Sequence, residues 1–335
     1  MTTTTMTPRA TGTMKALVQE GDGSADVLHL RDVPTPEPAA DRVLVKVRAA
    51  SVNALDWHSV HGGAMVSLAS KIMRSKAQPV RGVDVAGTVE AVGDNVTKFK
   101  RGDEVFGNAP ASFAEYASGH KDGLALKPAN VSFEQAAAVG VAGRTALQGL
   151  RDVAGVQPGQ RVLVHGAGGG VGTFSVQIAK ALGAHVTAVT GATKVDIARS
   201  LGADEVIDHS KEDFTRRPER FDVVFDVAAT RSVGDLRQVL VPGGVLVLVG
   251  ASKKGGAAIF LRIFNALIRS RVFQQRVKFF VAKQDLRDLP FLSGLLESGQ
   301  LTPRIDRTYP LSEAAEAVRY VGTGQARAKV VITMS

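Results

Sequence analysis

The sequence contains no cysteine in its 335 residues. This absence excludes disulfide bonds, cysteine nucleophiles and metal centres held by thiolates. No run of 18 apolar residues occurs either, so we expect no membrane-spanning helix. Residues 1–13 lack the apolar stretch of a signal peptide, and we interpret them as a disordered polar tail. A hydrophobic content of 44% suffices for one large or two medium globular domains, and a cytoplasmic location fits this composition.

Positive charge is in excess, with a formal net charge of +9 at pH 7. Residues 253–287 hold nine Lys or Arg and a single acid, Asp285. No nucleic-acid-binding motif accompanies them, so we expect no nucleic-acid partner. The basic residues alternate with apolar ones, which predicts an amphipathic helix with a basic face. Three roles stay open for this segment: flanking an anionic cofactor, contacting an anionic membrane surface, or forming an ordinary solvated face.

A glycine-rich segment, Arg161–Thr190, carries the strongest functional signal. An apolar run precedes its glycines, apolar residues at helical spacing follow them, and a second apolar run ends at Thr190. This succession of strand, glycine turn, helix and strand is the context in which dinucleotides bind. Glycines permit the tight turn and the close approach of phosphate, and free N–H groups at the helix start attract it. The residues expected to cradle the pyrophosphate are Gly168, Gly169, Gly170, Val171 and Gly172.

The remaining sequence shows two patterns of secondary structure. Short β-type runs with Gly and Pro punctuation come first and predict a compact, partly open barrel; they lie at 15–18, 42–47, 83–92 and 104–106. Strands at 222–227 and 245–249, with a helix at 233–240 between them, then predict a parallel sheet covered by helices. A helix at 285–297 and a strand at 329–333 complete the pattern. We expect this last strand to return to the first, β-rich domain.

The glycine run and its flanks resemble the quinone oxidoreductase and ζ-crystallin branch of the medium-chain dehydrogenase/reductase superfamily. Supporting segments are AASVNALDWH (49–58), RGVDVAGTVEAVG (81–93), AGRTALQGL (142–150), LGADEVID (201–208) and AKVVI (328–332). The resemblance implies an α/β fold of two domains. One is a GroES-like, partly open β-barrel catalytic domain at 14–137 and 290–335. The other is a Rossmann coenzyme domain with a doubly wound parallel sheet at 138–289, and the cofactor is expected in the cleft between the two.

The resemblance also bears on metal. Zinc-dependent members place a ligand where this sequence has Asn53, and a histidine where it has Val83. Neither side chain replaces a thiolate or an imidazole at zinc. His58 and His61 lie three residues apart, but no third ligand is evident, so we expect no metal. Without a Lewis acid, alcohol oxidation lacks its means of forming an alkoxide, whereas an electron-poor quinone or enone needs less help.

The end of the second strand indicates the cofactor. NAD-specific sites place an acid there, bonded to the ribose hydroxyls. This sequence has Thr190, followed by Lys194, and a carboxylate that would repel a 2′-phosphate is absent. The pattern favours NADPH. The alternative, that Lys194 is an ordinary exposed lysine at a helix start, stays open.

Candidates for the acceptor site follow from the resemblance. Asn53 is expected to face the nicotinamide, where its amide can donate to a substrate carbonyl; an asparagine that satisfies local backbone is an equal alternative. Asp56 and Trp57 follow in an expected helical turn, Asp56 with a structural role and Trp57 as pocket wall or core. Thr145 is expected to open a helix and contact the nicotinamide ribose or carboxamide, while the role of Arg144 stays open. Further cofactor contacts are expected at strand ends, from Val227, Ala228, Val249, Gly250, Ala251 and Lys329.

These observations predict a zinc-independent, NADPH-dependent oxidoreductase that transfers hydride to a small hydrophobic quinone or α,β-unsaturated carbonyl, as a monomer or homodimer. Residues 65–79 and the basic helix expected near 259–271 are expected to form a hydrophobic mouth for such an acceptor. Two alternatives stay open. One is an alcohol or carbonyl dehydrogenase of the same fold, and the other is a weakly catalytic NADPH-binding protein with a structural or redox-sensing role.

Overall fold

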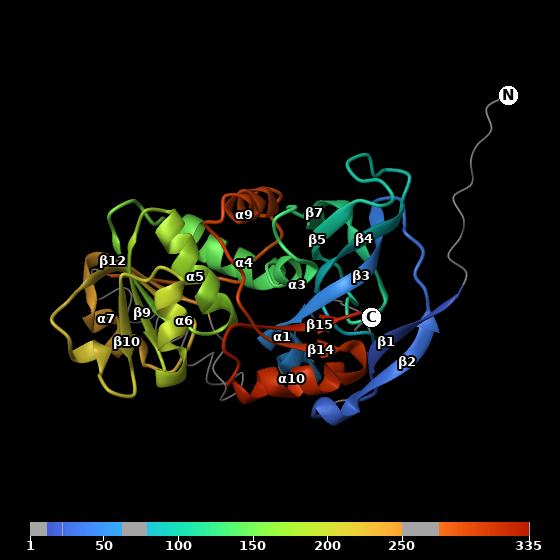
Figure 1. Cartoon of the computed structure of the whole chain (residues 1–335). Helices are drawn as coiled ribbons and strands as arrows, with labels where there is room; N and C mark the ends of the chain where they lie inside the picture. The colour runs from blue at the N-terminus through green and yellow to red at the C-terminus, as the bar shows by residue number, and fades with distance from the viewer. Residues whose placement is uncertain (1–11, 22, 62–78, 250–274, 335) are drawn as a thin grey trace. The chain divides into compact units, whose positions relative to one another are not determined.

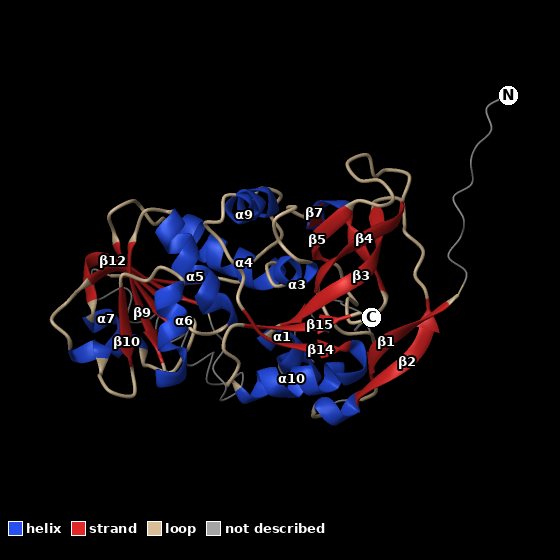
Figure 2. Cartoon of the chain, in the orientation of Figure 1, coloured by secondary structure: helices blue, strands red, loops and turns tan. Residues whose placement is uncertain are grey.

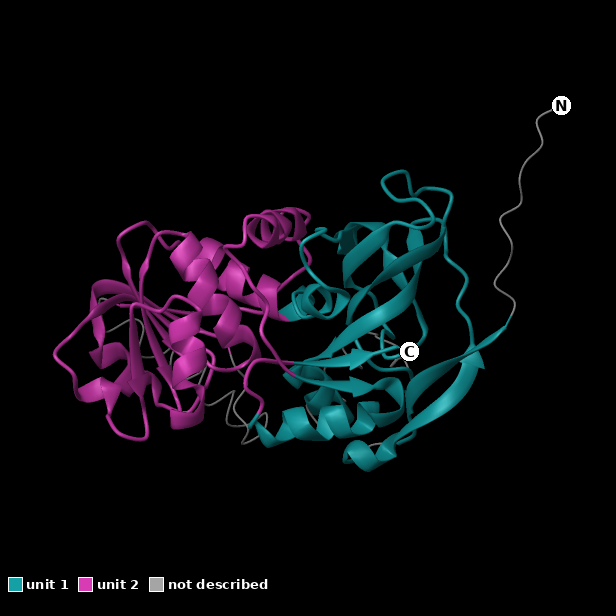
Figure 3. Cartoon of the chain, in the orientation of Figure 1, with its two compact units in different colours: residues 1–141, 307–325, 330–335 teal, residues 142–306, 326–329 magenta. Residues whose placement is uncertain are grey.

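The computed structural model describes residues 12–21, 23–61, 79–249 and 275–334, and the chain divides into two compact units (Figure 3). Unit 1 comprises residues 1–141, 307–325 and 330–335, and unit 2 comprises residues 142–306 and 326–329. Of the expected tail at 1–13, residues 1–11 lie outside the described residues. The same holds for residues 65–78 of the expected hydrophobic mouth and 253–274 of the basic segment.

Unit 1 is built on a sheet with the strand order β14-β15-β3-β4-β5-β7, and β6 also pairs with β3 (Figures 1 and 2). The strands are β3 (Arg42–Val52), β4 (Asp84–Val92), β5 (Glu104–Asn108), β6 (Tyr116–His120), β7 (Leu124–Leu126), β14 (Ile305–Pro310) and β15 (Lys329–Thr333). A separate antiparallel pair joins β1 (Thr13–Gln19) to β2 (Leu28–Pro34). β15 pairs antiparallel with β3, with Val330 opposite Val52. The expected return of the last strand to the β-rich part of the chain is therefore confirmed.

The central strand of this sheet, β3, shows why these residues form a core. Val43, Leu44, Val45 and Val47 are buried, whereas Lys46 and Arg48 are exposed. Three helices accompany the sheet: α1 (Ala54–Val60), α3 (Phe133–Ala137) and α10 (Ala314–Thr323). α3 packs on β3 and β4, and α1 packs on α10. Fully burying one Val or Leu side chain contributes about 1.5–3 kcal/mol, so these contacts dominate the stability of the unit.

Unit 2 contains a six-stranded parallel sheet with the order β10-β9-β8-β11-β12-β13. Its strands are β8 (Arg161–His165), β9 (His185–Thr190), β10 (Glu205–Asp208), β11 (Phe221–Asp226), β12 (Leu240–Leu248) and β13 (Arg276–Phe279). Helices described in this unit include α5 (Gly170–Ala181), α6 (Val195–Ser200), α7 (Val233–Gln238) and α9 (Asp288–Glu297). The chain moves outward from β8 on one side and from β11 on the other. This reversal is the Rossmann order, so the expected α/β fold is confirmed.

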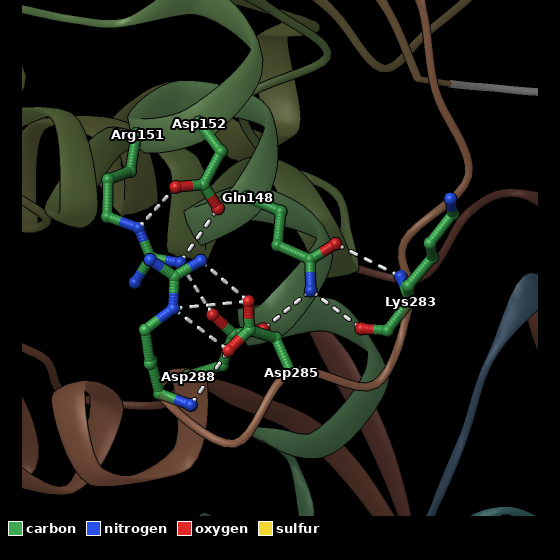
Figure 4. A network of polar contacts seen from close by, with 7 residues as sticks. Gln148, Arg151, Asp152, Lys283, Asp285 and Asp288 are labelled. Carbon is green, nitrogen blue, oxygen red and sulfur yellow. Dashed lines mark hydrogen bonds and ion pairs between the residues drawn. The ribbon is translucent and has the colours of Figure 1, made fainter.

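A polar network fixes the start of α9 (Figure 4). Asp288, fully buried, accepts hydrogen bonds from Gln148 Nε2 at 2.5 Å and Arg151 Nη2 at 2.7 Å. Arg151 also bonds Asp152, and this contact, with that to Asp288, raises the pKa of the guanidinium above its usual value despite burial. A buried carboxylate is stable only with such partners, so Gln148 and Arg151 hold α9 in place. The helix begins at Asp288 rather than at the predicted Asp285, whose side chain instead bonds Arg287.

Candidate functional site

The glycine turn after β8 is shaped by close backbone approaches. Gly166 has φ +93°, and a Cβ there would lie 2.9 Å from the N atom of Ala228. A Cβ at Gly172 would collide with the carbonyl oxygen of Gly166. Both positions therefore require glycine, the first for its conformation and the second because helix α5 packs closely on the turn.

Helix α5 begins directly after this loop. Gly169 is the N-cap residue, and Gly170, Val171 and Gly172 are the first three helical residues. In any α-helix these first N–H groups have no carbonyl partner within the helix. The first turn contains no acidic side chain that would neutralise the positive end of the helix dipole. The loop is therefore suited to an anion such as a pyrophosphate.

Two lysines flank this loop. A Cβ at Gly168 would lie 2.6 Å from Lys194 Cβ and Cδ, and 2.7 Å from Thr190 Oγ1, so the stem of Lys194 lies directly over the loop. A Cβ at Gly170 would lie 3.3 Å from Cδ of Lys329, a lysine that is only 2% exposed. Lys194 Nζ donates to the carbonyl oxygen of Ala326 at 2.6 Å. Two ammonium groups near a positive helix end make this part of unit 2 strongly attractive to phosphate.

Thr190 is the last residue of β9, as the sequence predicts, and it is buried. Val227 N and Ala228 N donate to the carbonyl oxygen of His165, and Val249 N donates to that of Asp226. These bonds place the three residues at the carboxyl ends of β8, β11 and β12, the edge where dinucleotides bind in open parallel sheets. Contacts of these residues with a cofactor stay predictions. Gly250 and Ala251 lie outside the described residues.

The expectation that Thr145 opens a helix is wrong. Helix α4 spans Gly140–Leu147, so Thr145 lies in its last turn, and Arg144 is buried in the same helix. The helix begins at Gly140, where a Cβ would collide with the carboxylate of Asp84.

Asp84 is the centre of a buried polar cluster in unit 1. Its Oδ2 accepts from Ser51 Oγ at 2.8 Å and from Asn53 Nδ2 at 2.9 Å. Its Oδ1 accepts from Asn108 Nδ2 and from the N–H of Val141, both at 2.8 Å. The side chain is fully buried, so these four donors are what makes a carboxylate tolerable there.

Asn53 and Asp56 form the start of helix α1. Asn53 is the N-cap residue, and its N–H donates to Asp56 Oδ2 at 2.7 Å. The Asn53 amide also donates to the carbonyl oxygen of Ser51 at 3.4 Å, besides its bond to Asp84. The amide thus contacts both local backbone and Asp84, and its expected position at the nicotinamide stays a prediction. Asp56, 4% exposed, has the structural position that the sequence indicated.

Trp57 lies between helices of unit 1. A Cβ at Gly322 of α10 would collide with its indole Nε1, so glycine is needed for the two helices to meet. The indole also contacts His61, with ring centroids 4.1 Å apart, and His58 at 4.8 Å. Burial lowers the pKa of His58 below its usual value. The tryptophan and both histidines thus belong to the packing of α1.

Sequence reasoning missed three central residues. The sequence indicates Asp84 only as a residue of the segment 81–93 and as a candidate partner of Arg144, not as the centre of a cluster. His165 and Asp226 form a buried pair at the ends of β8 and β11, with Nδ1 and Oδ1 2.8 Å apart. Asp226 lies within the strand predicted at 222–227, and His165 directly follows an apolar run; a polar residue at such a strand end was the available signal.

A Rossmann-ordered sheet with a glycine turn, together with a β-rich unit, defines the class of nicotinamide-dependent dehydrogenases and reductases. Comparison with known proteins gives the family. Residues 39–140 match the alcohol dehydrogenase GroES-like domain, and residues 201–332 match the domain described as zinc-binding dehydrogenase.

Relatives with similar sequences span nearly the whole chain. The chain is 37% identical to 2-methylene-furan-3-one reductase of Solanum lycopersicum, over 95% of this chain and 79% of that protein. It is 35% identical, with the same coverage, to the chloroplastic NADPH-dependent alkenal/one oxidoreductase of Arabidopsis thaliana. The structure of the quinone oxidoreductase from Coxiella burnetii matches with a TM-score of 0.83 and 30% identity, over 96% of this chain and 100% of that one. The chain therefore belongs to the quinone oxidoreductase branch of the medium-chain dehydrogenase/reductase superfamily, and it is an NAD(P)-binding oxidoreductase.

The second matching domain is described as a zinc-binding dehydrogenase, but the residues of this chain do not fit a zinc site. At Asn53, where the resemblance places a ligand in zinc-dependent members, the amide nitrogen donates to Asp84 Oδ2 and to the carbonyl oxygen of Ser51. Among the described residues, no group of three His, Cys, Asp or Glu side chains is arranged to hold a metal. Of these residue types, the rest of the sequence contains only Asp22. Zinc needs three or four N, S or O lone pairs directed at one point, and the Asp84 cluster presents hydrogens instead.

Across the described part of the chain, no helix combines the length and the apolar character needed to cross a membrane.

Proposed function

We propose that this chain is a zinc-independent, NADPH-dependent reductase that transfers hydride to a quinone or an α,β-unsaturated carbonyl. The single observation that carries the zinc-independence is the Asp84 cluster, in which four hydrogen-bond donors occupy the carboxylate next to Asn53. The names of the relatives, an alkenal/one oxidoreductase among them, support the acceptor class.

The cofactor site we propose lies on unit 2. The N–H groups of Gly170, Val171 and Gly172 would bind the pyrophosphate, with Lys329 supplying charge beside them. Thr190 and Lys194, which meet at Gly168, would bind the 2′-phosphate and so favour NADPH over NADH. When bound, the nicotinamide supplies the hydride for the acceptor. Arg144, Thr145, Val227, Ala228, Val249, Gly250 and Ala251 are proposed as further contacts.

In unit 1, we assign Asn53 and Asp56 to positioning. Their mutual hydrogen bonds and the bond to Asp84 fix the start of α1, and Trp57 fixes the same helix against α10. The carboxylates of Asp56 and Asp84 already accept hydrogen bonds from neighbouring N–H groups. We therefore propose that solvent provides the proton that completes reduction of the acceptor.

The experiment follows the absorbance of NADPH. Its oxidation is measured with a panel of quinones, enones and saturated aldehydes. The reverse reaction, reduction of NADP, is measured with primary alcohols. We expect turnover with quinones or enones and none with the alcohols. Turnover with alcohols would favour a dehydrogenase of the same fold. Binding of NADPH without turnover on any acceptor would favour a structural or redox-sensing role. Oligomeric state, monomer or homodimer, and cytoplasmic location stay predictions, for which light scattering and cell fractionation are the measurements.

A further inference from the structure

A buried contact between a histidine and an aspartate lies at the point where the strand order of unit 2 reverses. His165 ends β8 and Asp226 ends β11, and the two residues are register partners in adjacent parallel strands. Their side chains are 3% and 0% exposed, and His165 Nδ1 lies 2.8 Å from Asp226 Oδ1. Because an ionised carboxylate only accepts, Nδ1 carries the hydrogen of this bond.

The pair is tied to the loop that follows β11. Asp226 Oδ1 also accepts from the N–H of Ala229 at 3.1 Å, and Ala229 adopts φ +53°, in the left-handed region. Thr230 Oγ1 lies 3.3 Å from His165 Nε2. A non-glycine residue in this conformation costs about 1 kcal/mol or more and needs surrounding contacts to hold it. The carboxylate and the imidazole provide those contacts.

The same loop forms one wall of the glycine turn. The carbonyl oxygen of His165 accepts from both Val227 N and Ala228 N. Gly166 follows directly in sequence, and a Cβ there would meet Ala228 N at 2.9 Å and Ala228 Cβ at 3.0 Å. Ala228 and Gly166 are therefore packed to within contact distance. A shift of residues 227–230 would therefore change the shape of the glycine turn at Gly166.

We propose that His165 and Asp226 are positioning residues which hold residues 227–230 against the glycine turn and thereby set the affinity for the dinucleotide. This inference rests on the proposed cofactor site. Both side chains are enclosed, so neither touches the acceptor, and their effect falls on cofactor binding rather than on hydride transfer. His165 packs on Phe214, with ring centroids 5.1 Å apart, so an aromatic ring in its place keeps this ring contact.

The test compares His165→Phe and Asp226→Asn with the parent protein. His165→Phe keeps a ring beside Phe214 but removes both polar contacts. In each variant we expect the Kd for NADPH, measured by direct fluorescence titration, to rise about tenfold above that of the parent. This rise is equivalent to the loss of one hydrogen bond to a charged group. KM for NADPH should rise in parallel, while kcat at saturating NADPH should stay within about twofold. His165→Asn, whose amide can still donate to Asp226, should recover part of the affinity.

A matched control separates positioning from general destabilisation. Leu236 is fully buried in the same apolar cluster as Phe214, and Leu236→Ala should lower the melting temperature without changing the Kd. If folded His165→Phe binds NADPH as tightly as the parent, or if Leu236→Ala weakens binding equally, the inference is overturned. A loss confined to kcat would overturn it as well. Since Kd is measured without turnover, inactivity of the parent on every acceptor would contradict the proposed reaction and leave this test intact.

Discussion

Asn53 and Asp84 are joined across 31 residues by a 2.9 Å hydrogen bond from the asparagine amide to the buried carboxylate. In zinc-dependent members of the superfamily, a metal ligand occupies the position of Asn53. Here the amide belongs to a cluster of hydrogen bonds that links β3, β4 and β5 to the start of α4. The position of Asn53 is therefore fixed by the carboxylate of Asp84 and its hydrogen bonds rather than by a metal ion.

Gly140→Ala tests the tightness of that cluster. The new Cβ would collide with Asp84 Oδ1 and approach Asn108 Nδ2 to 2.8 Å. Because backbone and buried polar groups must shift, we expect a loss of about 2 kcal/mol or more in the free energy of unfolding. Chemical denaturation measures it. Gly294→Ala in α9 is the control, since a Cβ there meets nothing within 4 Å and should stabilise the helix by about 0.5–1 kcal/mol. Equal effects of the two substitutions would contradict the description of the cluster.

Lys194→Ala tests the proposed 2′-phosphate contact. Removing the ammonium should lower kcat/KM for NADPH about tenfold and leave that for NADH nearly unchanged, because only NADPH carries the additional phosphate. Arg199→Ala is the control: Arg199 is 66% exposed, pairs with Asp196, and should affect neither cofactor. Lys329→Met should instead weaken NADPH and NADH alike, because both contain the pyrophosphate. A parent enzyme that uses both cofactors equally well would refute this assignment.

Ala328→Gly tests a strained backbone position beside the loop. Ala328 is buried and has φ +112°, a conformation that favours glycine. Replacing it by glycine relieves this strain, and we expect the free energy of unfolding to rise by about 1 kcal/mol, or the melting temperature by a few degrees. Ala317→Gly, in helix α10, should have the opposite sign. Destabilisation by both substitutions would show that Ala328 is unstrained.

Asp204→Asn tests a pH-dependent set of hydrogen bonds in unit 2. Burial opposes ionisation of Asp204, but hydrogen bonds from Lys180 Nζ and Val186 N outweigh it and lower its pKa below the usual value. A carboxyl whose folded-state pKa is depressed stabilises the fold above its unfolded pKa of about 3.9, and this contribution is lost as pH falls through the folded value. The substitution should therefore cost about 1–2 kcal/mol at pH 7. Unfolding curves from pH 7 to pH 3 should show the difference shrinking below about pH 4; a constant or growing difference would contradict the assignment.

The sequence predicted the Rossmann unit well because its signals are local. The glycine run, the apolar strands on either side and the absence of an acid at Thr190 can all be recognised within 30 residues. The final strand, Lys329–Thr333, was also predicted at its observed bounds. Strands such as β6 and β14 were missed, since their burial patterns are mixed and their partners are distant in sequence.

The polar clusters could not be predicted for the same reason. Asp84 gathers donors from residues 51, 53, 108 and 141, and no pattern in the sequence indicates that these positions meet. The start of helix α4 at Gly140 shows the limit most clearly. The missing side chain of this glycine makes room for the carboxylate of Asp84, a residue 56 positions earlier in the chain.

The central claim is that this reductase works without a metal. The most direct measurement is NADPH-dependent reduction of an enone or quinone by protein dialysed against a strong chelator, with zinc content determined on the same sample. The account predicts an unchanged rate and no stoichiometric zinc. Loss of turnover on chelation, with recovery on adding Zn²⁺, would contradict it.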